Sequence, residues 1–124
     1  MFRTLAIGAT LAAVLVVGVG VASARTETIP ALKATVGPGF TITLKRNATK
    51  VKVLRAGSYK FVISDKASAH GFTLEQVKGG KWEKVRSPVG FVGSKTVTVK
   101  LKAGKWKFYC PAHESSMFGF FTVS

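Results

Sequence analysis

Short segments that alternate apolar and polar residues constrain the fold of this chain more than any other feature. The clearest of them cover residues 40–44, 59–63, 96–101 and 106–110. A period of two is typical of a β-strand with one buried face. Further short strands are predicted at residues 32–36, 51–54, 72–76 and 119–123.

Turn-forming sequences lie between these segments, as in Gly37-Pro38-Gly39 and Ala103-Gly104-Lys105. No window of residues 25–124 shows a helical period. The pattern predicts an all-β fold of seven to eight strands in a two-sheet sandwich. Residues 78–93 are the least regular stretch, and we expect them to form a long connection between the sheets.

The first 24 residues differ from the rest. Arg3 is followed by an uncharged apolar run, residues 5–22, and then by Ala22-Ser23-Ala24. This order predicts a secretory signal peptide cleaved after Ala24. An uncleaved membrane anchor is the alternative, because about 18 apolar residues can just span a bilayer. We therefore expect export to the periplasm or the outside of the cell, with residues 25–124 forming one domain.

The charge of the chain is strongly positive. Without Arg3, 18 Lys and Arg residues face five acidic residues, a net charge of +13. Such an excess steers a protein toward anionic surfaces. Export argues against nucleic acid as the partner, so an acidic redox partner protein, an anionic membrane and a charged cell wall remain. The lysines lie mostly at the polar positions of the strands, where they also protect sheet edges from pairing with other chains.

The side chains suited to bind a soft metal ion gather near the carboxyl terminus. Beyond residue 24 the chain has one cysteine, two histidines and one methionine. Cys110, His113 and Met117 lie within eight residues, and His70 precedes a predicted strand 40 residues before Cys110. A thiolate and two imidazoles with a weak axial thioether is the ligand set of blue copper.

Each of these residues also has an ordinary interpretation. Cys110 alone fits a buried free thiol or a disulfide between chains, His70 and His113 fit ordinary histidines, and Met117 fits a core position. Zinc is a rival metal, since one cysteine and two histidines can hold it tetrahedrally with a fourth ligand. Thioether is a poor ligand for zinc, so Met117 favours copper.

The sequence Cys-x-x-His-x-x-x-Met, followed by Phe118-Gly119 and a last strand, resembles the copper loop of the cupredoxins, the plastocyanin-like proteins. Residues 56–65 and 70–72 resemble the first-ligand region of small bacterial cupredoxins, and residues 91–93 and 104–110 resemble the approach to the cysteine. The resemblance implies a cupredoxin-like Greek-key sandwich and one type 1 copper ion. It implies His70, His113 and Cys110 as equatorial ligands and Met117 as the axial one.

Two residues depart from the family pattern. Gly71 stands where the family commonly has Asn, and Pro111 stands where it often has a polar residue. The side-chain tie between the two ligand segments is therefore absent. The backbone N–H groups of Gly71 and Ala112 remain as donors to the sulfur, and such bonds tune a metal site.

The expected function is electron transfer by a monomer, with His113 as the partly exposed ligand. We expect an apolar docking patch around it, formed by Pro111, Met117, Phe118, Pro38 and Phe40. Copper sequestration or delivery with the same ligands is one alternative, and a non-redox domain with a vestigial or zinc-occupied site is another. An enzyme is not expected, because the chain has too few histidines and cysteines for a second metal cluster.

Overall fold

The computed structural model describes residues 13–18, 20 and 28–124. Most of the predicted signal peptide and its cleavage point after Ala24 lie outside these residues. Among the described residues, no helix has the length and apolar character to span a bilayer. The boundary between the predicted signal peptide and domain therefore stays a prediction.

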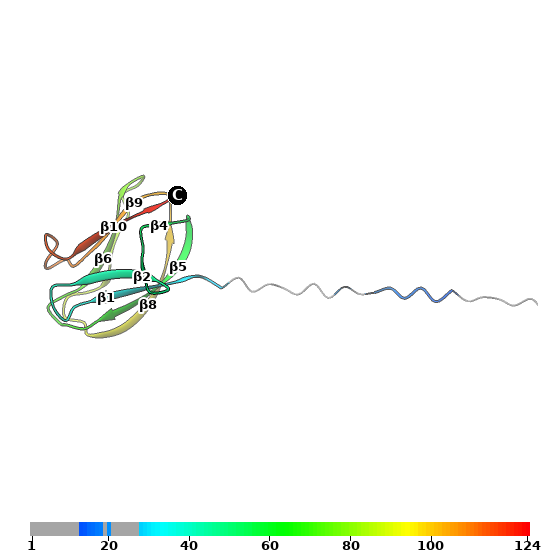
Figure 1. Cartoon of the computed structure of the whole chain (residues 1–124), viewed down its shortest axis with the longest axis horizontal. Coiled ribbons are helices and arrows are strands. Elements are labelled where there is room, and N and C mark those ends of the chain that lie inside the picture. Colours follow the sequence, from blue (N-terminus) through cyan, green and yellow to red (C-terminus); the bar gives the residue numbers. More distant parts are fainter. Residues whose placement is uncertain (1–12, 19, 21–27) are drawn as a thin grey trace, which may run out of the picture.

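Two five-stranded sheets make up residues 31–123, and they lie as two layers (Figure 1). The first has the order β3-β2-β1-β5-β8 and the second β4-β10-β9-β6-β7. The first sheet contains β1 (Ala31–Val36), β2 (Ile42–Arg46), β3 (Thr49–Lys50), β5 (Gly57–Asp65) and β8 (Gly93–Leu101). The second contains β4 (Val53–Leu54), β6 (Phe72–Lys78), β7 (Glu83–Ser87), β9 (Gly104–Tyr109) and β10 (Phe118–Val123).

Both sheets are mixed, because β1 pairs with β5 and β10 with β4 in parallel while the other pairs are antiparallel. The chain crosses between the sheets after β3, β4, β5, β7 and β8. The predicted all-β sandwich is confirmed. Its strand number is ten rather than seven to eight, and the two-residue strands β3 and β4 replace the single strand predicted at residues 51–54.

The core lies between the sheets, where the inward side chains of each strand meet. Alternation on β5 buries Tyr59, Phe61 and Ile63, and β9 contributes Trp106 and Phe108. Aromatic pairs span this layer, as between Phe61 and Phe72, whose ring centroids are 6.4 Å apart. The period of two in the sequence therefore has its expected physical cause, one buried face on each strand.

The connection predicted at residues 78–93 is wrong over its middle part. Residues 83–87 form β7, an edge strand that pairs with β6. Glu83, Lys84 and Val85 are exposed and Ser87 is buried, so the strand lacks the apolar side chains that make alternation visible. The pairing contains a bulge at Phe72/Thr73, directly beside His70 and Gly71.

Candidate metal centre

The loop between β9 and β10 is closed by its own backbone hydrogen bonds. The Cys110 amide donates to the Met117 carbonyl over 3.0 Å, and the His113 amide donates to the Cys110 carbonyl over 3.0 Å. The amides of Ser116 and Met117 both donate to the His113 carbonyl. These bonds turn the chain back on itself, so the loop alone brings His113 beside Cys110.

The segment that ends at His70 is held by more distant parts of the chain. Asp65, at the end of β5, is buried and accepts hydrogen bonds from the Ser87 hydroxyl at 2.9 Å and the Ala67 amide at 3.3 Å. The His70 amide then donates to the Ala67 carbonyl over 3.2 Å. His70 therefore takes its place from contacts between β5, the end of β7 and the intervening turn.

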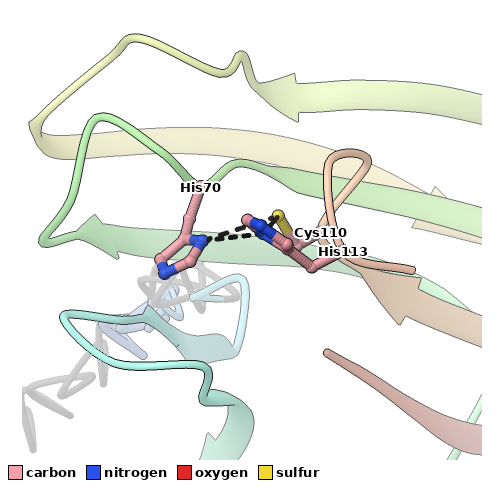
Figure 2. A group of neighbouring side chains, drawn as sticks. All are labelled: His70, Cys110 and His113. Carbon is pink, nitrogen blue, oxygen red and sulfur yellow. Dashed lines mark hydrogen bonds between the residues drawn. The ribbon is translucent and has the colours of Figure 1, made fainter. Parts of the chain in front are cut away.

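The side chains of His70, Cys110 and His113 point toward one another (Figure 2). The Nδ1 atoms of the two histidines are 3.1 Å apart. The Cys110 Sγ lies 3.9 Å from Nδ1 of His70 and 3.7 Å from Nδ1 of His113. All three ligand atoms lie within 4.8 Å of one another. Residues separated by 40 positions in the sequence thus present three soft or imidazole donors to one point.

Burial differs among the predicted site residues. Cys110 and Met117 are fully buried and His70 is 3% exposed, whereas His113 is partly exposed. The Phe40 ring packs edge-on against both imidazoles, with centroids 5.6 Å from His70 and 5.0 Å from His113. His113 is therefore the one partly accessible residue of the three-residue cluster.

Steric crowding around residue 71 favours glycine at this position. A Cβ at this residue would lie 2.6 Å from the Ser87 carbonyl oxygen and 3.1 Å from the Val89 nitrogen. The Asn common in the family does not fit there unless the backbone moves. The Gly71 amide donates to Cys110 Sγ over 3.4 Å, so the donor predicted to replace the missing side-chain tie is present. The hydrogen bonds of the described residues include none from Ala112 to the sulfur.

The spacing of the three atoms can be tested against a metal ion. An ion about 2.0 Å from each nitrogen and about 2.3 Å from sulfur sets N···S distances of about 3.7 Å in trigonal and about 3.5 Å in tetrahedral geometry. The observed distances of 3.7 and 3.9 Å match the trigonal arrangement better. The N···N distance of 3.1 Å is shorter than either geometry gives. The three donor atoms are therefore close enough to share one metal ion.

The residues predicted to form an apolar docking patch are only partly at the surface. Phe40 is 67% and Phe118 46% exposed, and Pro38 and Pro111 are exposed as well. Met117 is fully buried and does not belong to this surface. Met117 comes directly before β10, and its side chain belongs to the buried hydrophobic core.

Tyr109, the last residue of β9, links the metal loop to the edge strand β7. Its hydroxyl donates to the Glu83 carboxylate. Burial, followed by this hydrogen bond and the charge of Glu83, raises the pKa of Tyr109 above its ordinary value. Burial and the charge of Glu83 also raise the pKa of Glu75. The charges of Glu75, Glu83 and Glu114, three of the five acidic residues of the chain, thus all raise the pKa of Tyr109.

Sequence reasoning did not identify the residues that support His70. Asp65 and Ser87 hold the His70 segment, and Phe40 covers both imidazoles. The only sequence signal for Asp65 is an acid at an apolar position of a strand, where burial demands a hydrogen-bond partner. Ser87 and the packing of Phe40 depend on tertiary contacts that no local pattern encodes.

Comparison with known proteins gives a match at the level of structure only. No protein-family model and no curated protein matches this chain. A solved structure described as the copper protein rusticyanin is 23% identical, covers 76% of each chain and superposes with a TM-score of 0.51. Rusticyanin from Thiobacillus ferrooxidans is 21% identical over 76% of each chain, with a TM-score of 0.45.

Proposed function

We propose that this chain, which has the cupredoxin fold, carries single electrons with one type 1 copper ion. The resemblance drawn from the sequence is confirmed at the level of fold by the likeness to rusticyanin. Copper would be held by His70, Cys110 and His113, with Met117 as the axial ligand. The observation that carries the proposal is the cluster of two imidazole nitrogens and one sulfur within 4.8 Å.

The choice of metal follows from the donor chemistry. One cysteine sulfur and two imidazoles near a plane, with a thioether available from the side, is the set that copper takes in electron-transfer proteins. Copper supplies the Cu(I)/Cu(II) couple when bound. Zinc prefers four tetrahedral ligands and gains little from Met117.

The chain's own residues keep the donors in place during a change of oxidation state. The backbone bonds within residues 110–117 and the Asp65–Ser87 bond restrict both ligand segments. Burial of Cys110 and His70 keeps water from the sulfur. The Gly71 N–H withdraws charge from the sulfur, which favours the reduced ion.

Electron exchange would take place at the partly exposed ligand. His113 is the site residue nearest the solvent, and the exposed ring of Phe40 lies edge-on beside it. An acidic redox partner would dock there, guided by the positive charge of the chain. We further propose that the protein is a monomer, is exported to the periplasm or beyond, and acts as a carrier rather than an enzyme.

Titration of the metal-free protein with Cu(II) tests this function. We expect an intense thiolate-to-copper absorption band that saturates at one equivalent, and reversible reduction. Cys110→Ala should lose the band, whereas Ser116→Ala, which removes only an exposed hydroxyl, should keep it. A colourless protein, or one that takes up zinc and leaves copper, would contradict electron transfer. Copper that passes readily to a chelator without reversible cycling would support delivery instead.

A further inference from the structure

The outer face of the first sheet carries a row of lysines that are direct neighbours. Lys33 of β1 stands opposite Lys45 of β2, and Lys45 stands opposite Lys50 of β3. Residues paired in this way share one face of a sheet. Lys33 and Lys50 are exposed and Lys45 is partly exposed. The three ammonium groups therefore project side by side into solvent.

Two further lysines extend this face along the sheet. On β5 the inward residues Tyr59 and Phe61 are buried, so Lys60 between them points outward. On β8 the buried Val99 and Leu101 leave Lys100 outward in the same way. We call these five residues the lysine face: Lys33, Lys45, Lys50, Lys60 and Lys100. Toward the end of the sheet nearest His70, the same face carries hydroxyl side chains, as in the opposed pairs Thr35–Thr43 and Ser64–Ser94.

The four acidic side chains in the described part of the chain lie elsewhere. Asp65 is buried and bonded to Ser87, and Glu75 and Glu83 belong to the second sheet. Glu114 forms an ion pair with Lys107 of β9, the one ion pair among the described residues. The lysine face thus has no acidic partner within residues 28–124. The two outer surfaces of the sandwich differ in charge composition.

Such an arrangement is unfavourable in the isolated protein. Neighbouring strands are about 4.8 Å apart, which is less than the Debye length of about 8 Å at physiological ionic strength. Like charges directly opposite one another destabilise a sheet. Protection of a sheet edge accounts for lysines on the edge strand β3, but not for those opposite on the interior strands β2 and β1. An external anion would relieve this repulsion.

The geometry of the lysine face indicates the shape of that anion. The lysines extend across the strands from β3 to β1 and onward to β8, so they form a two-dimensional array on a sheet face. A linear polymer would neutralise one row, whereas a planar anionic surface can contact all of them. Val62 is the largest apolar side chain among the outward residues of β5, so no anchor for insertion is present there.

We propose that the lysine face binds the surface of an anionic lipid bilayer. The face is set back from the metal centre, since β1 runs from Ala31, paired with Lys60, to Val36 at the end nearest Gly37 and His70. β8 runs the other way, which puts Lys100 at the far end of the sheet. Binding to a bilayer would therefore leave His113 accessible. The inference does not depend on which metal the site holds.

Vesicle binding by the full chain tests the proposal. We expect tight binding to phosphatidylcholine vesicles that contain phosphatidylglycerol, and weak binding to vesicles of phosphatidylcholine alone. Binding to the neutral vesicles measures any contribution of the apolar residues 5–22. Each lysine near an anionic surface contributes about fivefold in partition coefficient. Changing all five lysines of the face to Gln should lower anionic-vesicle binding more than about 100-fold. Raising the salt concentration should weaken binding of the unaltered protein.

A matched variant separates the face from the overall charge. It changes five exposed lysines elsewhere to Gln: Lys78, Lys81, Lys84, Lys102 and Lys105. We expect this control to lose less than about tenfold. The denaturation midpoint of the lysine-face variant should rise slightly, because opposed like charges are removed, and that of the control should not fall. The copper spectra of both variants should be unchanged. Equal losses in the two variants, or equal binding to neutral and anionic vesicles, would overturn the proposal. So would binding to polyglutamate without binding to the anionic vesicles, which would point to an acidic protein.

Discussion

The two segments that form the candidate metal centre are fixed in different ways. Residues 110–117 hold one another by hydrogen bonds between residues no more than seven positions apart. The His70 segment depends on Asp65 and Ser87, which are 22 positions apart, and on the Gly71–Cys110 contact across 39 positions. One half of the site is local in the sequence and the other half is built by the whole sandwich.

This difference has consequences for stability. Local contacts can open without unfolding the domain, whereas contacts between distant strands break only when the sandwich does. Changes beside His70 should therefore lower the free energy of global unfolding. Changes at the exposed residues of the loop, such as Ser116, should alter local protection and leave global stability nearly unchanged.

Copper binding should have the largest effect, because it would make both ligand segments depend on the same ion. Copper joins both segments to one ion, so addition of Cu(II) to the metal-free protein should raise the free energy of unfolding by about 4 kcal/mol when free copper exceeds its dissociation constant 1,000-fold. Hydrogen exchange should slow most at the amides of Ser116 and Met117. Urea denaturation and exchange experiments measure the two quantities. Copper binding that leaves the loop amides as exposed as before would contradict a shared ion.

Gly71→Ala should lower the free energy of unfolding, because it disturbs the His70 segment, which depends on distant contacts. The new Cβ would lie 2.6 Å from the Ser87 carbonyl oxygen, so the backbone of one segment must move. Overpacking of this kind costs about 3 kcal/mol. Gly39→Ala is the matched control, because nothing lies within 4 Å of its Cβ. Equal unfolding midpoints for the two variants would show that the close approach at Gly71 does not restrain His70.

Removing one supporting hydrogen bond from each segment should give a smaller difference in stability. Asp65→Ala leaves the buried Ser87 hydroxyl without its acceptor, which should cost about 2 kcal/mol of folding free energy. Ser116→Ala removes an exposed hydroxyl bond to the His113 carbonyl and should cost less than about 0.5 kcal/mol. Denaturant titration of the metal-free variants measures both. A larger loss for Ser116→Ala would reverse the distinction between the segments.

The same contrast explains how much of the site the sequence predicts. Cys110 and His113 converge because of bonds inside their own loop, so their spacing already indicates that they meet. The sequence points to His70 only because the chain beyond residue 24 has one other histidine, and no local pattern indicates how it is held. Asp65, Ser87 and the steric need for Gly71 appear only once β5, β6 and β7 are placed.

Prediction of the strands is limited in the same way, because it depends on a local sequence pattern. Strands with one buried face, such as β5, were predicted from alternation. The edge strand β7 was missed because four of its five residues are exposed or only partly buried, and the pleat leaves no apolar pattern to detect. Sequence periodicity reports burial, so elements that bury little are not visible to it.

The smallest effect concerns Tyr109, through which the local loop meets β7. Burial and the bond to Glu83 raise its pKa, so the folded chain holds the phenolic proton more tightly than the unfolded chain, whose tyrosine has a pKa of about 10. This contribution is complete below that pH and is lost as the pH rises through the raised value.

We expect the free energy of unfolding to fall more steeply above about pH 10 in the unaltered protein than in Tyr109→Phe, by at most about 1.4 kcal/mol per pH unit. Glu83→Gln, which keeps the phenol and removes the charge of its partner, should fall between the two. Urea titrations at alkaline pH measure these slopes. Identical slopes for all three proteins would mean that Tyr109 ionises alike in the folded and unfolded states, and that its bond to Glu83 does not couple the end of β9 to β7.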